Sequence, residues 1–137
     1  MENSMQILLI EDDEIEIMKF HRTISKLKLK HQVIEARNGE EALQILSKKD
    51  RLPHIILLDL NMPKINGIEF LNILKKDSVL KYIPTIVLST SNNYKDMLEC
   101  YKIGIAGYVV KPLKYEEYKE KMLKILSYWS INELISV

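Results

Sequence analysis

The segment HIILLDLNMP, residues 54–63, decides the fold of this chain. Its first five residues are almost wholly apolar, a pattern typical of a strand that is buried on both faces of a sheet. An acid, Asp59, follows directly at the end of this strand, and Asn61 comes two residues later. Strands buried on both faces occur mainly in parallel sheets that helices cover, so the segment favours an α/β fold.

Short apolar runs alternate along the chain with longer segments of helical period. The runs are Gln6–Ile10, Gln32–Ala36, His54–Leu58, Thr85–Leu88 and Gly107–Val110. The helical segments place apolar residues on one stripe each: Ile17, Phe20, Ile24 and Leu27; Ala42, Leu43 and Leu46; Ile68, Leu71 and Leu74; Met97, Leu98 and Tyr101; Tyr118, Met122, Ile125 and Trp129. Five strands and five helices in strict alternation predict a doubly wound, open parallel sheet.

Size and composition limit the classes of protein that this chain can be. At 137 residues, 47% of them apolar and 28% charged, it fits one soluble globular domain. A net charge of +1 gives no general reason to expect binding to nucleic acid or to a membrane. The acids at 11–13 interrupt the first apolar run too early for a signal peptide, and no run approaches the roughly twenty residues of a membrane span. The single cysteine, Cys100, excludes an internal disulfide, fits a reducing cytoplasm and is interpreted as packed within a helix.

Polar residues follow the strands at the predicted edge where such sheets carry their functional groups, beside the point of strand-order reversal. They are Glu11, Asp12 and Asp13 after the first run, Asp59 and Asn61 after the third, Ser89, Thr90 and Ser91 after the fourth, and Lys111 and Pro112 after the fifth. Carboxylates from two strands, hydroxyls from a third and a lysine from a fourth are therefore expected to meet.

This predicted edge carries more acid than base. Crowded carboxylates raise one another's pKa values unless a cation neutralises them. Oxygen ligands of this kind suit Mg²⁺, which takes one or two protein carboxylates and keeps water or phosphate oxygens elsewhere. Asp59 could then act as a nucleophile towards phosphorus, with the metal and Lys111 offsetting the charge of the group in transfer.

Each of these residues also has a plainer interpretation when it stands alone. An acid after a strand is most often a helix N-cap or a solvated charge, and Asp13 fits the cap of the first helix. Ser89 alone indicates a turn, Lys111 a surface lysine and Tyr108 a core residue. Three histidines share no metal-ligand spacing and are interpreted as surface or strand-start residues: His21, His31 and His54.

Taken together, the segments resemble the response-regulator receiver domains of two-component signalling. The resemblance covers Met5 to about Trp129 and is carried by residues 7–13, 57–63 with Asn66-Gly67, 84–90 and 107–112. Any one of these segments is a weak motif, but four in order at strand ends are specific. The resemblance implies a flavodoxin-like strand order 2-1-3-4-5 with five helices, a receiver domain over 5–129, and a C-terminal apolar extension over 130–137.

The resemblance also implies a role for each residue at the edge. Asp59 matches the aspartate that accepts the phosphoryl group, and Lys111 matches the lysine that acts beside it. Glu11 and Asp12 match the acidic pair that holds Mg²⁺ together with Asp59 and the backbone carbonyl of Asn61. Glu in place of Asp at the first acidic position is a mild departure that leaves metal binding intact.

Other positions match the moving parts of the family. The hydroxyl of Ser89 matches the group that hydrogen-bonds a phosphoryl oxygen, and Tyr108 matches the aromatic residue that turns inward when this happens. Pro112 matches the proline whose preceding peptide bond is often cis, and Asp13 is the third, less critical acid.

The resemblance implies a signalling switch rather than an enzyme, one that at most catalyses its own phosphorylation and dephosphorylation. The expected donor is a phosphohistidine on a sensor histidine kinase or a phosphotransfer protein. The expected reader is a downstream protein target that contacts the surface of the fourth helix, fifth strand and fifth helix. Such a switch is expected in the cytoplasm.

Apolar residues continue to the C-terminus: Tyr128, Trp129, Ile131, Leu134, Ile135 and Val137. They either pack back against the domain or form a homodimer contact through the last helix and the tail. This tail and the segment 59–63 look like the receivers that partner bacterial phytochromes and related kinases, which tend to dimerise.

Two other classes share parts of the pattern. A Mg²⁺-dependent phosphohydrolase also uses an aspartate nucleophile, but it needs a second acid two residues later, where this chain has Asn61, and room for a substrate pocket. A flavin-binding electron carrier shares the sheet order, but it needs a loop rich in hydroxyls and glycine after the first strand. Glu11 and Asp12 would repel the flavin phosphate there.

Overall fold

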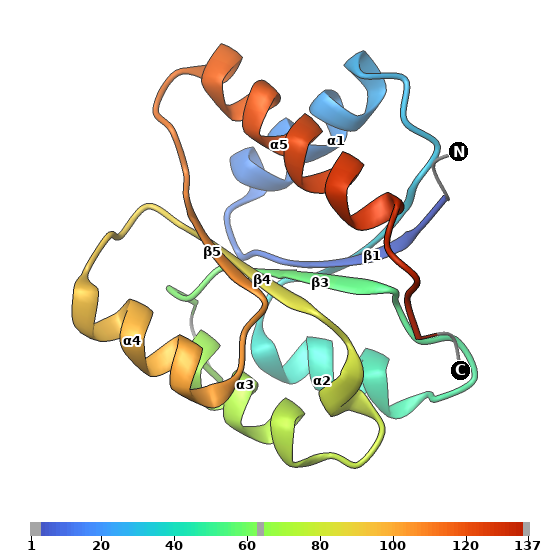
Figure 1. Ribbon diagram of the computed structural model, residues 1–137, viewed down its shortest axis with the longest axis vertical. Helices are drawn as coiled ribbons and strands as arrows, with labels where there is room; N and C mark the ends of the chain where they lie inside the picture. The colour runs from blue at the N-terminus through green and yellow to red at the C-terminus, as the bar shows by residue number, and fades with distance from the viewer. Residues whose placement is uncertain (1–3, 63–64, 136–137) are drawn as a thin grey trace.

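The central strand of the sheet is β3 (Ile55–Leu58), whose residues are fully buried. The computed structural model describes residues 4–62 and 65–135. In this part of the chain the five strands form one parallel sheet of order β2-β1-β3-β4-β5 (Figure 1). In it β3 pairs with β1 (Gln6–Ile10) and β4 (Thr85–Ser89), and β2 (Gln32–Ala36) and β5 (Gly107–Val110) form the edges. The predicted α/β class and strand order are confirmed.

Helices cover both faces of this sheet. They are α1 (Glu14–Lys26), α2 (Gly39–Ser47), α3 (Gly67–Lys76), α4 (Tyr94–Ile103) and α5 (Tyr115–Ser130). The pair α1 and α5 lies on one face, and α2, α3 and α4 lie on the other (Figure 1). Successive side chains of a strand point to opposite faces, so Ile7 and Leu9 of β1 pack under α1 and α5, whereas Leu8 and Ile10 pack on the other side. Among the described helices, none is long and apolar enough to cross a membrane.

Side chains at the N-termini of four helices accept hydrogen bonds from the first turn. These N-caps are Asp13, Asn38, Asn66 and Asn93. Asp13 accepts from the backbone N–H of Ile15 at 2.9 Å, which confirms its plain interpretation as the cap of α1. In α3, Glu69 reaches back to the backbone of Asn66 and completes a capping box. The caps fix the ends of the loops that carry the polar residues after β1, β3 and β4.

The predicted apolar stripe of the fourth helix is wrong. Met97, Leu98 and Tyr101 are expected to face the core, but Leu98 and Tyr101 are 40% and 50% exposed in α4. The fully buried residue is Cys100, which packs in the core on the α2–α4 side. Cys100 and the partly buried Ile103 thus face the core, whereas Leu98 and Tyr101 face outward. The expected packing of Cys100 is confirmed, and burial raises the pKa of its thiol to about 11.

Two of the histidines secure the start of β1. The Nδ1 atom of His31 accepts from the backbone N–H of Met5 at 3.0 Å, and that of His54 accepts from Gln6 at 2.8 Å. The third, His21, is exposed and pairs with Glu35. Their interpretation as strand-start or surface residues is confirmed.

A short 3₁₀ helix, η1 (Leu80–Tyr82), precedes β4 and is absent from the sequence prediction. Asp77 organises it, because its carboxylate accepts from the backbone N–H groups of Val79 and Leu80 at 2.9 and 3.0 Å. The same carboxylate lies 3.1 Å from Nζ of Lys49. The bonds to Leu80 and Val79, followed by that to Lys49, lower the pKa of Asp77 to about 2.

We expect the substitution Asp77→Ala to lower the melting temperature at neutral pH by an amount that shrinks in acid. The pKa of about 2 in the folded chain lies below the ordinary 3.8, so folding favours the ionised carboxylate. This contribution is complete above about pH 4 and is lost as the pH falls through about 2. Thermal unfolding across this range measures it, with the exposed Asp50→Ala as control. An Asp77→Ala deficit that is as large near pH 2 as near pH 7 would contradict the assignment.

Candidate functional site

The acids that follow the first and third strands meet at the carboxyl edge of the sheet. One carboxylate oxygen from each of Glu11, Asp12 and Asp59 lies within 4.8 Å of the other two, and we name these residues the acidic cluster. Parallel pairing places them there, because Ile10 and Leu58 are in register and the N–H of Asp59 donates to the carbonyl of Ile10 at 3.0 Å. Neighbouring strands that end in register therefore deliver their following acids side by side.

Positive charge compensates the acidic cluster only in part. Glu11 is 4% exposed, and burial raises the pKa of its carboxyl to about 7 although Lys111 acts in the opposite direction. Burial also raises the pKa of Asp59, against the lowering effects of the hydrogen bond with Glu11 and the charge of Lys111. A bound cation would favour the ionised form of both carboxyls.

The donor set of the acidic cluster fits a hard divalent cation. Its carboxylate oxygens are the ligands that Mg²⁺ takes in proteins, and they converge at a strand edge where phosphate oxygens and water could fill the other positions. Asn61 lies beside the cluster, because its N–H donates to Oδ1 of Asp59 at 3.3 Å. Its carbonyl oxygen as a further ligand stays a prediction.

Lys111, which follows β5, enters this site. Its Nζ lies 2.6 Å from Oε1 of Glu11, and its side chain is 8% exposed. The backbone N–H of Lys111 donates to the carbonyl of Ser89 at 2.8 Å, so pairing between β4 and β5 continues to the site. Burial lowers the pKa of the ammonium group, but the hydrogen bond and charge of Glu11 outweigh it and the pKa is raised. No peptide bond in the described residues is cis, including the one before Pro112.

Ser89 and Tyr108 are joined through the loop that follows β4. The Oγ of Ser89, which is fully buried, accepts from the N–H of Ser91 at 3.1 Å. The hydroxyl of Tyr108 donates to the carbonyl of Ser91 at 2.9 Å. Both predicted switch residues therefore hold the same loop residue, and in the described part of the chain no hydrogen bond joins them to the acidic cluster.

Sequence reasoning missed one acid next to the site. Oε2 of Glu16, in the first turn of α1, lies 3.7 Å from Nζ of Lys111. The sequence does contain a hint of this position. Glu16 lies in the first turn of the helix that Asp13 caps, four residues after Asp12. The pattern alone did not separate it from the other solvated acids of that helix.

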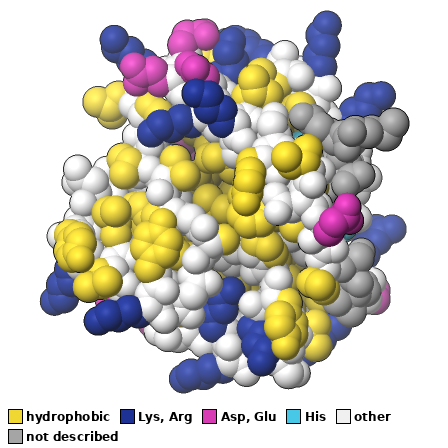
Figure 2. Space-filling model, in the orientation of Figure 1, with side chains coloured by type: hydrophobic (Ala, Val, Ile, Leu, Met, Phe, Trp, Pro, Cys, Tyr) yellow, Lys and Arg dark blue, Asp and Glu magenta, His cyan; other side chains and the backbone are white. Residues whose placement is uncertain are grey.

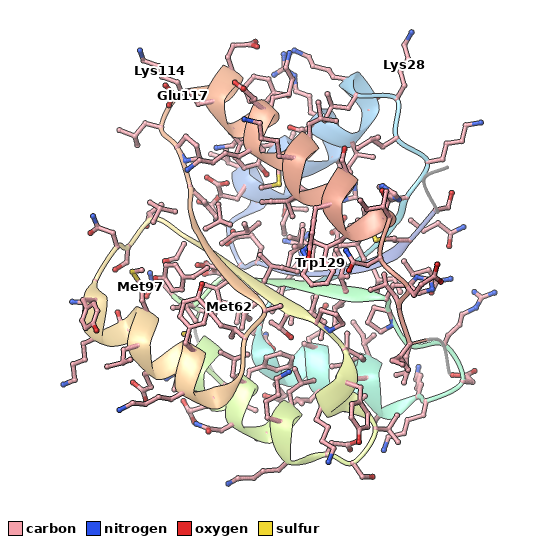
Figure 3. All side chains as sticks on the ribbon, in the orientation of Figure 1. Lys28, Met62, Met97, Lys114, Glu117 and Trp129 are labelled. Atoms are coloured by element: carbon pink, nitrogen blue, oxygen red, sulfur yellow. The ribbon has the colours of Figure 1, made fainter. Side chains whose placement is uncertain are left out.

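The loop after Asp59 is tightly packed. A Cβ added to Gly67 would lie 2.6 Å from Cα of Leu60, and one added to Gly39 would lie 2.5 Å from the carbonyl oxygen of Ile65. Met62 of this loop is 8% exposed and lies on the side of the sheet that α2, α3 and α4 cover (Figure 3). Pro63, part of the sequence motif, lies outside the described residues. The packing fixes the backbone next to Asp59.

The family model of the response regulator receiver domain matches residues 7–123 of this chain. The chain belongs to this family. The probable methanogenesis regulatory protein FilR2 of Methanothrix harundinacea is 33% identical over 132 residues, which are 93% of this chain and 85% of that protein. Response regulator Rcp1 of Synechocystis is 31% identical over 128 residues, which are 90% of this chain and 87% of Rcp1.

Solved structures of receiver domains superpose closely on this one. The phosphorylated cyanobacterial phytochrome response regulator RcpA gives a TM-score of 0.90 at 32% identity, over 97% of this chain and 99% of RcpA. The Mn²⁺-bound form of Rcp1 gives a TM-score of 0.88 at 30% identity, over 96% of this chain and 99% of that chain. The predicted resemblance to receivers of the phytochrome-partner type is confirmed. Receiver domains are signalling switches, and a divalent cation site is supported by both the acidic cluster and the Rcp1 structure.

Proposed function

We propose that this receiver domain accepts a phosphoryl group on Asp59 from a phosphohistidine of a sensor histidine kinase or a phosphotransfer protein. The observation that carries the proposal is the acidic cluster with Nζ of Lys111 2.6 Å from Glu11. The phosphorylated RcpA structure supports it, and by similarity a phytochrome-type kinase in the cytoplasm is the proposed donor.

The bonds that form and break in the transfer belong to Asp59 and to the donor alone. A carboxylate oxygen of Asp59 attacks phosphorus in line with the P–N bond of the donor. The O–P bond forms as the P–N bond breaks, and the electron pair of the broken bond returns to the imidazole ring. Lys111 offsets the negative charge on the phosphoryl oxygens during the transfer. The product on this chain is an acyl phosphate.

The proposed cation is Mg²⁺. Asp12, Asp59 and the carbonyl of Asn61 would hold it directly, and Glu11 would act through water. When bound, it supplies positive charge to the phosphoryl oxygens. It also offsets the mutual repulsion within the acidic cluster, so that Asp59 stays ionised.

The acyl phosphate would then act on the loop after β4. The hydroxyl of Ser89 turns from Ser91 to donate to a phosphoryl oxygen, and Tyr108 gives up its bond to Ser91 and moves inward. Phosphorylation in this way biases two arrangements of the loop. The face formed by α4, β5 and α5, where apolar side chains gather at the surface (Figure 2), then changes its preferred protein target.

The C-terminal residues supply a second proposed contact, between two copies of the chain. Trp129, in the last turn of α5 (Figure 3), and Leu134 beyond the helix are partly buried against the core on the α1–α5 side of the sheet, which favours packing of this part of the chain on its own domain. Tyr128, Ile131 and Ile135 are 57%, 63% and 58% exposed within eight residues of sequence, and a segment rich in exposed apolar groups favours an interface. Val137 lies outside the described residues, and the predicted boundaries of 5–129 and 130–137 stay predictions.

Intact-mass spectrometry after incubation with acetyl phosphate tests the proposed function. We expect one phosphate to be added in the presence of Mg²⁺ and none when a chelator removes the metal, because the crowded carboxylates need a cation before a phosphate dianion can approach. A control incubation with acetate and inorganic phosphate should leave the mass unchanged. Phosphate gained at the same rate with the chelator present would contradict the metal-assisted mechanism.

A further inference from the structure

Glu16 lies beside Lys111 but outside the acidic cluster. Its Oε2 is 3.7 Å from Nζ of Lys111, and its Oε1 is 3.5 Å from Nζ of Lys19, three residues further along α1. The Lys19 ammonium group in turn lies 4.3 Å from the centre of the Tyr118 ring on α5. The carboxylate of Glu16 is therefore held between two ammonium groups, one of which is fixed by a buried aromatic ring.

Lys111 needs a negative neighbour because its side chain is only 8% exposed, and a buried charge without a partner is strongly unfavourable. Its close partner in the structure is Glu11 at 2.6 Å. The proposed function requires the ammonium group to turn from Glu11 towards a phosphoryl oxygen on Asp59. While the ammonium group turns, it has left Glu11 and has not yet reached the phosphoryl oxygen. Glu16 on α1 supplies a carboxylate next to the same ammonium group during this turn.

We propose that Glu16 is the positioning residue of Lys111, which holds the ammonium group at the edge of the sheet while it exchanges Glu11 for the phosphoryl group. This inference rests on the proposed function of Asp59. Glu16 acts only through Lys111, because it is not one of the residues of the acidic cluster. Through Lys19 and Tyr118 it also ties Lys111 to α5.

The substitution Glu16→Gln tests the proposal, because it removes the charge and keeps the shape of the side chain. We expect the rate of phosphorylation by acetyl phosphate to fall by roughly five-fold, the size expected for losing one partly exposed ion pair. Glu16→Asp keeps the charge and should recover part of the rate. Glu14→Gln is the matched control, because Glu14 lies in the same turn of α1 but pairs with Arg37, and its rate should equal that of the native chain.

A second measurement detects the environment of the Lys111 ammonium group directly and needs no phosphorylation. In ¹H–¹⁵N spectra of lysine ammonium groups, the Lys111 signal is assigned by its loss in Lys111→Met. We expect Glu16→Gln to shift this signal or broaden it, and Glu14→Gln to leave it in place. A role of Glu16 in helix stability alone would change the melting temperature without moving the Lys111 signal.

The outcomes separate the two proposals. A slower rate together with a displaced Lys111 signal in Glu16→Gln alone supports the positioning role. An unchanged rate, or an unmoved Lys111 signal, overturns it. If the native chain takes up no phosphoryl group under any condition, the proposed function fails and the positioning role in transfer fails with it, whatever the Lys111 signal does.

Discussion

The substitution Asp59→Asn is expected to abolish the uptake of phosphate from acetyl phosphate. An amide lacks the anionic oxygen that attacks phosphorus, and the other two members of the acidic cluster, Glu11 and Asp12, lie in the loop after β1 rather than after β3. Intact-mass spectrometry of the variant with Mg²⁺ measures the effect, and we expect no adduct at times when the native chain is fully modified.

A matched control separates the loss of the nucleophile from a general loss of negative charge. Asp13 lies next to the acidic cluster but is not one of its members, and it caps α1. Because Asn is as good a cap as Asp, Asp13→Asn should stay folded and take up one phosphate. If Asp59→Asn were labelled at the native rate, the acceptor would be another residue.

The substitution Gly67→Ala is expected to destabilise the fold strongly. The new Cβ would lie 2.6 Å from Cα of Leu60 and 2.8 Å from its Cδ2, and the first of these atoms belongs to the backbone. The N–H of Gly67 also donates to the carbonyl of Leu60 at 3.1 Å, so the helix cannot move away without losing this bond. We expect a loss of about 3 kcal/mol in the free energy of unfolding, the upper part of the range for overpacked sites.

Urea unfolding of Gly67→Ala measures this loss, and Asn72→Ala is its control. Asn72 is exposed on the same helix, so its replacement should change the free energy of unfolding by less than about 0.5 kcal/mol. Because Leu60 directly follows Asp59, the variant should also take up phosphate more slowly than the native chain. A Gly67→Ala variant as stable as Asn72→Ala would show that the loop after β3 yields easily.

The sequence was sufficient to predict the strands of the sheet, because strands that are buried on both faces are short, almost wholly apolar runs. The run at 54–58 and its four counterparts gave the strand positions to within one residue at each end. The parallel pairing then places residues that follow strands at one edge, which is why Glu11, Asp12, Asp59 and Lys111 could be expected to meet before any distance was known.

Surface helices and ion-pair partners were harder to predict. In α4 the fully buried residue is the small Cys100, whereas the larger Leu98 and Tyr101 are exposed, so a stripe drawn through Leu98 and Tyr101 points away from the core. The partners of Lys111 depend on how α1 is rotated over the sheet, and this rotation follows from the packing of Ile17 and Phe20. Such packing is a property of the folded core and not of the spacing around Glu16.

The most direct test of the central claim is to locate the acyl phosphate chemically. The native chain is treated with acetyl phosphate and Mg²⁺ and then reduced with borohydride, which converts an aspartyl phosphate to homoserine, and peptides that span residues 7–19 and 54–62 are sequenced by mass spectrometry. We predict homoserine at position 59 and intact aspartate at positions 12 and 13. Homoserine at either of those positions, or at none, would contradict the assignment of Asp59 as the phosphoryl acceptor.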